Sequence, residues 1–121
     1  MVLGRGNAVK QQIKAQELTI YIGESDHWKG SPLYAVIVSK LKENGIAGVT
    51  VLHGVEGFGS SGKLHTERFE VLFQQMPIVI QAVDIPERIT VALAILDELL
   101  TEALVTVHDV VAIRYIKDPA A

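Results

Sequence analysis

The order of strand-like and helix-like segments constrains this chain more than any other feature of its sequence. Runs rich in β-branched residues predict four strands, at about residues 17–23, 48–53, 78–83 and 110–116. Apolar residues at helical spacing predict two helices, over about 31–44 and 84–100. The chain therefore has the order strand, helix, strand, strand, helix, strand.

Start and stop signals support both helices. Ser31 has the hydroxyl group of a typical N-cap, and Pro32 suits the first helical position. Gly45 follows the first helix and favours a left-handed end. Asp84 and Glu87 have the spacing of a capping box, which predicts the start of the second helix at Asp84.

This order of elements is that of the ferredoxin-like βαββαβ sandwich, an α+β fold with two helices on one face of a four-stranded antiparallel sheet. Neighbouring strand positions are nevertheless both apolar, as in Val51 and Leu52 or in Val79 and Ile80. Helices cover only one face of such a sheet, so the second apolar face needs another subunit to bury it. The pattern therefore predicts an oligomer.

A glycine-rich connection separates the second and third strands. Four glycines fall within nine residues, at positions 54, 57, 59 and 62, inside a connection that extends over about residues 54–76. Long loops in compact domains are usually functional or disordered. Glycine permits positive φ and close approach of the backbone to a ligand. We therefore expect the functional site at this loop.

Composition limits the class of protein. A length of 121 residues fits one domain. The absence of cysteine excludes disulfides, thiolate metal sites and cysteine nucleophiles. No apolar run approaches the roughly 18 residues of a membrane span, and the N-terminus lacks the apolar core of a signal peptide. These features predict a cytoplasmic protein with no direct membrane insertion.

Charge is unevenly distributed along the chain. Residues 1–16 carry three basic and no acidic residues, whereas the remaining residues carry 8 basic and 14 acidic ones. An acidic body argues against nucleic-acid binding, because that affinity comes mostly from phosphate neutralisation. We expect residues 1–16 to form a flexible basic extension, or alternatively a docking arm, before a domain at 17–117 and a tail at 118–121.

The chain contains several short motifs that occur together in a known protein family. They are IYIGESD (20–26), GSPLY (30–34), GIAGVTV (45–51), VEGFG (55–59), LHT (64–66), VDIPERI (83–89) and LVT (104–106). In this order, from about Glu17 to Lys117, they resemble the PII-like family of domain of unknown function 190, related to the nitrogen regulatory PII signalling proteins.

The resemblance implies a homotrimer of ferredoxin-like subunits whose sheets line the centre. In PII-type trimers adenine nucleotides bind in clefts between subunits, and the long loop after the second strand changes shape with the ligand. That loop docks on a protein target, often a membrane transporter, a channel or an enzyme. Such an assembly would account for both the second apolar face and the glycine-rich connection.

The chain departs from PII proteins where those proteins hold polyphosphate. PII proteins have a glycine-rich, lysine-containing loop before the last strand, but residues 100–104 here read LTEAL. They also end the last strand with two arginines one residue apart, whereas this chain has Arg114 and then Ile116. Fewer cations compensate a triphosphate less well. We therefore expect AMP or ADP, before ATP, as an effector, with no required cofactor.

The resemblance and the loop together select the candidate ligand-binding residues. In the loop they are Gly54, Glu56, Gly57, Phe58, Gly59 and His65. The alternatives are that the glycines only permit a turn, that Phe58 fills a subunit contact and that His65 is a solvated loop residue.

Four further candidates lie outside the loop. Glu24, Trp28 and Lys29 follow the first strand, where Trp28 would cover a cleft or simply cap the first helix. Arg114 is a charge within an apolar strand, which is costly unless it is paired. It would bind a ligand or form a salt bridge to a neighbouring subunit.

Catalytic motifs are absent from the sequence. It contains no nucleophile elbow, Walker loop or HExxH helix, and the histidines lack the spacing of a metal site. We therefore expect no catalytic and no metal-binding residues. Two alternatives to the PII-like regulator stay open, a CutA-like metal-tolerance trimer and a small-molecule enzyme at the cleft between subunits.

Overall fold

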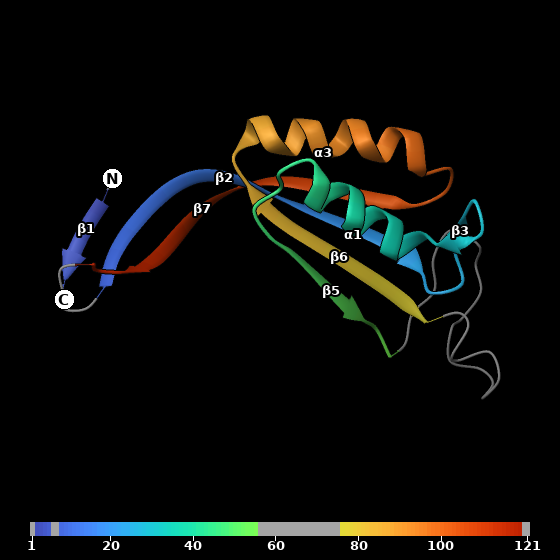
Figure 1. Cartoon of the computed structure of the whole chain (residues 1–121), viewed down its shortest axis with the longest axis horizontal. Helices are drawn as coiled ribbons and strands as arrows, with labels where there is room; N and C mark the ends of the chain where they lie inside the picture. The colour runs from blue at the N-terminus through green and yellow to red at the C-terminus, as the bar shows by residue number, and fades with distance from the viewer. Residues whose placement is uncertain (1, 6–7, 56–75, 120–121) are drawn as a thin grey trace.

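The computed structural model of the chain describes residues 2–5, 8–55 and 76–119 (Figure 1). The long strands are β2 (Ala8–Gly23), β5 (Val49–His53), β6 (Pro77–Asp84) and β7 (Leu104–Lys117). The helices are α1 (Leu33–Glu43) and α3 (Pro86–Leu99). Three short strands complete the list, namely β1 (Val2–Arg5), β3 (His27–Trp28) and β4 (Ser31–Pro32).

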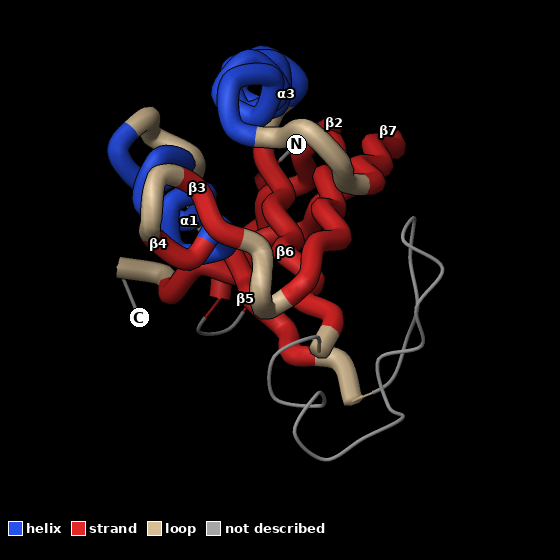
Figure 2. The backbone as a smooth tube through the Cα atoms, turned by 90° about the vertical axis from the view of Figure 1, so that its right-hand side faces the viewer, coloured by secondary structure: helices blue, strands red, loops and turns tan. Residues whose placement is uncertain are grey.

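The main sheet has the strand order β5-β6-β2-β7, and every adjacent pair is antiparallel. Both helices pack on the same face of this sheet (Figure 2). The fold is therefore the α+β ferredoxin-like sandwich that the order of elements predicts. β1 adds a short antiparallel partner at the start of β2.

The core lies between the sheet and the two helices. Alternate residues of the two central strands point into it, among them Ile20 of β2 and Ile80 of β6, which pair across the sheet and are fully buried. Ile37 of α1 and Ile89 of α3 are equally buried on the helical side. Burial of each such side chain stabilises the fold by about 1.5–3 kcal/mol.

The opposite face of the sheet, called here the open face, has no helical cover among the described residues. One row across it consists of Leu52, Val79, Tyr21 and Leu104, which are paired in register. The exposed fractions are 48% for Leu52, 44% for Tyr21 and 60% for Leu104. This row is the second apolar face that the sequence indicates.

Both helices begin differently from the expectation. Ser31 and Pro32 form β4, so α1 starts at Leu33, and Pro32 caps it without a side-chain hydrogen bond. The N-cap of α3 is Ile85 rather than Asp84, again without a side-chain cap. The expected left-handed end of α1 is present, because Gly45 has a φ of 82°.

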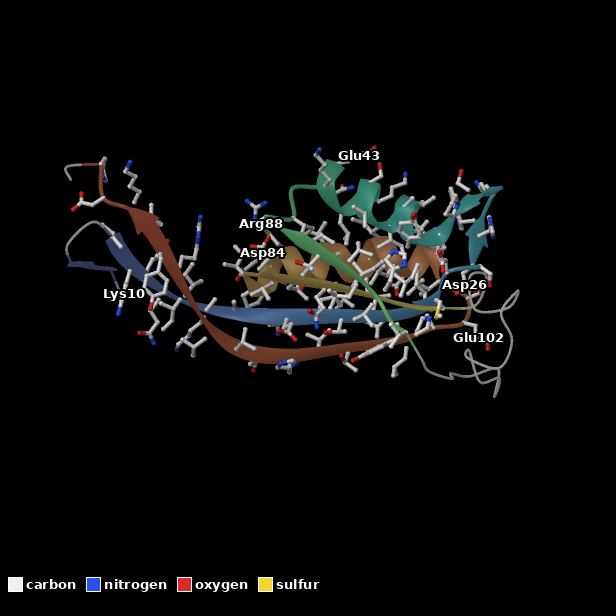
Figure 3. The ribbon with its side chains drawn as sticks, turned by 90° about the horizontal axis from the view of Figure 1, so that it is seen from below. Lys10, Asp26, Glu43, Asp84, Arg88 and Glu102 are labelled. Carbon is white, nitrogen blue, oxygen red and sulfur yellow. The ribbon has the colours of Figure 1, made fainter. Side chains whose placement is uncertain are left out.

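Asp84 instead joins two turns that are distant in sequence. Its carboxylate accepts hydrogen bonds from the backbone N–H groups of Ala47 (2.9 Å) and Ile85 (2.8 Å). Arg88, one turn along α3, lies beside Asp84 (Figure 3) with Nε 3.9 Å from the carboxylate, and its Nη1 donates to the Gly45 carbonyl. This network connects the α1–β5 turn with the start of α3.

The first and last strands are longer than the sequence predicts. β2 begins at Ala8 and not at residue 17, and β7 begins at Leu104 and not at residue 110. The pairing of these strands runs without a bulge from Ala8–Lys117 to Tyr21–Leu104. Residues 8–16, expected in a flexible extension, are therefore a paired strand, because β7 is long enough to supply their backbone partners.

Candidate functional site

Three strand ends meet where the chain enters and leaves residues 56–75. Glu24, just after β2, donates its backbone N–H to the Met76 carbonyl at 2.8 Å. Gly54, just after β5, donates to the Pro77 carbonyl at 2.7 Å. We call this junction of Glu24, Gly54, Met76 and Pro77 the loop base. These two short backbone hydrogen bonds hold the three strand ends together.

Gly54 is required by close packing at the loop base. A Cβ atom at this position would lie 2.6 Å from Cγ of Pro77 and 3.4 Å from the Pro77 carbonyl oxygen. Such a distance is far inside van der Waals contact, so any larger residue must displace one of the strand ends. The glycine thus permits the close packing of β5 against Pro77, whereas the predicted approach of these glycines to a ligand stays a prediction.

Asp26 fixes the turn that follows β2. Its Oδ2 accepts the N–H of Gly23 at 2.9 Å, and its carbonyl accepts the N–H of Leu33 at 2.8 Å. The side chain therefore closes the turn and the backbone connects the turn to the start of α1. Asp26 is not among the candidate ligand residues, although aspartate is favoured in turns because its carboxylate accepts hydrogen bonds from nearby backbone N–H groups.

The β3–β4 hairpin carries two of the predicted ligand residues. Its two-residue loop is Lys29-Gly30, and both residues have positive φ, 48° and 84°, as a type I′ turn requires. Trp28 packs partly against the core, and Nζ of Lys29 lies 4.5 Å from the centre of its ring. A lysine in the left-handed region is uncommon, so its place at this hairpin tip is consistent with a functional role.

An aromatic contact lies beside the end of β5. The Tyr34 ring of α1 meets the His53 ring of β5 edge to face, with 6.1 Å between the ring centres. His53 immediately precedes Gly54. The contact therefore connects the first helix to the strand that enters the loop, and sequence reasoning missed it because it gave Tyr34 no role.

The structure brings together only part of the predicted site. Glu24, Trp28 and Lys29 share the segment between β2 and α1, and Glu24 and Gly54 both belong to the loop base. Arg114 pairs with Gln11 near the far end of β7, about 30 Å along the strand from Leu104 at the usual strand rise. One further set lies outside the described residues, namely Glu56, Gly57, Phe58, Gly59 and His65.

Acidic side chains gather at the same end of the sheet as the loop base. Asp26 and Glu102 lie at this end, opposite Lys10 (Figure 3). Glu24 adds a third carboxylate at the loop base, and Lys29 is the cation of the adjoining hairpin. Among the described residues, this balance offers little compensation for a highly charged anion.

An open depression of about 340 Å³ lies on the outer side of α1, lined by Ser31, Pro32, Ala35, Val36, Ser39 and Lys40. Among the described residues no group of acidic or histidine side chains has the arrangement of a metal site. None of the described helices is long and apolar enough to cross a membrane.

Comparison of the sequence with known families gives a match over most of the chain. The profile of the DUF190 family, described as an uncharacterised ACR, matches residues 15–112. A UPF0166 protein of Methanocaldococcus jannaschii is 40% identical over 77 residues, which cover 64% of this chain and 70% of that protein. A UPF0166 protein of Aquifex aeolicus is 27% identical over 77 residues, 64% of this chain and 73% of that protein.

Solved structures with the same fold are PII-like proteins. CPII of Thiomonas intermedia, bound to ADP, AMP and bicarbonate, has a TM-score of 0.62 at 17% identity, over 84% of this chain and 96% of CPII. A PII-like signalling protein of Thermus thermophilus has a TM-score of 0.58 at 16% identity, over 84% of this chain and 90% of that one. At these identities the likeness shows the fold.

Proposed function

The chain belongs to the DUF190 family of PII-like proteins, and from this membership we propose that it is a regulatory protein that binds an adenine nucleotide between subunits. AMP or ADP is the effector, and its binding changes the glycine-rich loop. The loop then docks on a protein target, for which a membrane transporter or channel is our candidate. The protein acts in the cytoplasm as a homotrimer and catalyses no reaction.

The loop base carries this proposal. Backbone hydrogen bonds join the strand ends at the loop base, and the hairpin that follows Glu24 in the chain carries a half-buried tryptophan and a lysine. An indole ring offers a face on which a base stacks, and an ammonium group offers a charge for a phosphate. The CPII structures with bound ADP and AMP support an adenine nucleotide as the ligand to test.

A site between subunits agrees with the shape of the single chain. The open face of the sheet exposes Leu52, Tyr21 and Leu104 close to the strand ends that form the loop base. Apolar area of this kind is normally covered in the assembled protein. A neighbouring subunit that covers the row would also supply the missing wall of a cleft at the loop base.

We expect AMP and ADP to bind at least about tenfold more tightly than ATP, a difference of about 1.4 kcal/mol. The reason is the charge at this end of the molecule, where Glu24, Asp26 and Glu102 accompany Lys29. Isothermal titration calorimetry of the full chain with each nucleotide measures the three affinities. Tighter binding of ATP than of ADP would contradict this part of the proposal.

Lys29→Asn is expected to weaken ADP binding while the protein stays folded. Asparagine tolerates the left-handed conformation, so the free energy of unfolding should fall by no more than about 0.5–1 kcal/mol, the contribution of the lost cation–π contact. The affinity for ADP should fall about tenfold, because a charge-assisted contact is lost. Trp28 is the only tryptophan of the chain, so its fluorescence reports ADP binding at this hairpin directly.

A matched control removes one lysine charge elsewhere. Lys40→Gln on α1 makes the same charge change at another exposed lysine, and it should leave ADP affinity unchanged. Equal losses in both variants would indicate only a long-range effect of net charge. Unchanged affinity in Lys29→Asn would remove Lys29 from the site.

A further inference from the structure

Part of β2 and β7 extends past the rest of the fold as an arm. We define the arm as residues 8–15 of β2 with residues 110–117 of β7, which pair beyond Gln16–Asp84, the last pair between β2 and β6. At the usual rise this length is about 25 Å. Figure 1 shows the arm curving away from the layer of α1 and α3, so neither helix covers it.

One face of the arm combines exposed apolar residues with lysines. Val111, Ile113 and Tyr115 alternate along β7 and have exposed fractions of 59%, 53% and 66%. They pair across the arm with Lys14, Gln12 and Lys10, and the ammonium group of Lys10 lies 5.4 Å from the centre of the Tyr115 ring.

The other face of the arm continues the open face of the sheet. It carries Val9, Ile13 and Ile116, and its only charged residue is Arg114, which pairs with Gln11. β7 is therefore apolar on both faces within the arm. Strands with this composition are normally covered on both faces, and long unprotected edge strands are avoided in isolated proteins.

Charge indicates what covers the arm. The arm contains four basic residues and no acidic one, whereas the rest of the chain contains seven basic and fourteen acidic residues. The outer surface of α3 alone exposes Glu87, Asp97 and Glu98. A second copy of the same chain is thus a complementary partner in both charge and apolar area.

We propose that the arm docks on a second copy of this chain, with its apolar faces covered by that copy and its lysines beside that copy's acidic residues. The two surfaces differ, one being an arm and the other the body of the subunit. Repetition of such a contact closes a ring of three when the rotation between neighbouring subunits is about 120°, and an open filament forms otherwise. The inference therefore rests on the proposed homotrimer and describes how its subunits hold one another.

Photo-crosslinking in the full chain tests this contact directly. Tyr115 and Ile116 lie on opposite faces of the arm, so each is replaced in turn by the photoreactive residue p-benzoylphenylalanine. Illumination is expected to give covalent dimers from both positions, and peptide mapping should place the crosslinks within residues 17–108. The same residue at Ala35, an exposed position on α1, is the control and should give at least about fivefold less dimer.

A pair of charge variants tests the role of the lysines. Lys10→Gln with Lys14→Gln should weaken self-association about tenfold at low salt in analytical ultracentrifugation, with less effect at high salt because screening removes the attraction. Lys40→Gln with Lys42→Gln makes the same charge change on α1 and should leave association unchanged. Circular dichroism confirms that each variant is folded.

The outcomes separate this inference from the proposed function. A stable trimer without crosslinks from the arm would overturn the docking arm and leave the trimer in place. A wild-type chain that is monomeric at micromolar concentration would overturn both. If the Lys10 and Lys14 variant keeps its association but loses binding to vesicles of anionic phospholipid, a lipid surface covers the arm and the inference is wrong.

Discussion

Replacement of Asp84 by alanine is expected to lower the free energy of unfolding by about 3 kcal/mol, because the carboxylate accepts two hydrogen bonds and a bond to a charged group contributes about 1.5–3 kcal/mol. The carboxylate accepts from Ala47 and Ile85, and its side chain is only 9% exposed. Its loss leaves two backbone N–H groups without this acceptor and removes the partner of Arg88. The start of α3 and the α1–β5 turn should both loosen.

Urea unfolding at one fixed protein concentration measures this effect, since association would otherwise change the apparent stability. Asp84→Asn keeps one acceptor oxygen, so it should lower the free energy of unfolding by less than Asp84→Ala does. Asp97→Ala on the exposed face of α3 is the control and should change stability by less than about 0.5 kcal/mol. If Asp84→Ala also changes the free energy of unfolding by less than about 0.5 kcal/mol, water replaces these hydrogen bonds without loss of stability and the prediction is wrong.

The sequence predicted the fold because its apolar periodicity changes clearly from strand to helix in the central part of the chain. The prediction was wrong in the arm, where charged residues made a paired strand resemble a solvated extension. Residues 8–16 read AVKQQIKAQ, and the lysines suggested a solvated extension. What makes them a strand is a partner about a hundred residues away, which no local pattern reveals.

The early start of β7 was missed for a related reason. His108 and Asp109 interrupt its apolar run, so the strand was predicted to begin after them. In the structure each polar residue faces a polar partner on β2. Asp109 accepts a hydrogen bond from Gln16 at 3.1 Å, and His108 lies 3.8 Å from the Glu17 carboxylate. Cross-strand pairing therefore accommodates them.

Part of the candidate site was predictable and part was not. Trp28 and Lys29 were expected to follow the first strand, and they form part of the hairpin between β2 and α1; their part in ligand binding stays a prediction. Asp84 was given a local capping role, whereas its longer-range partner is Ala47. Arg114 could not be placed in advance, because its distance from the loop base depends on where β7 begins.

Gly54→Ala is expected to have the second large effect, and it acts at the loop base itself. The added Cβ would lie 2.6 Å from Cγ of Pro77, and overpacking of this kind costs about 1–3 kcal/mol. The strand ends must move apart, so the 2.7 Å bond from Gly54 to the Pro77 carbonyl should lengthen. ADP affinity should fall as well, because the glycine-rich loop would leave β5 in another direction.

A double-mutant cycle identifies the cause of that loss. Pro77→Ala alone removes the ring that the new methyl group strikes, so the Gly54→Ala/Pro77→Ala double variant should be more stable than the sum of the single variants predicts. A favourable coupling of about 1 kcal/mol or more in urea unfolding is expected for residues in direct contact. If the stability losses of the two single variants simply add in the double variant, the strain of Gly54→Ala does not come from contact with the Pro77 ring. If the double variant recovers stability together with ADP affinity, the geometry of the loop base controls ligand binding, whereas recovery of stability alone would separate the packing of the strand ends from the site.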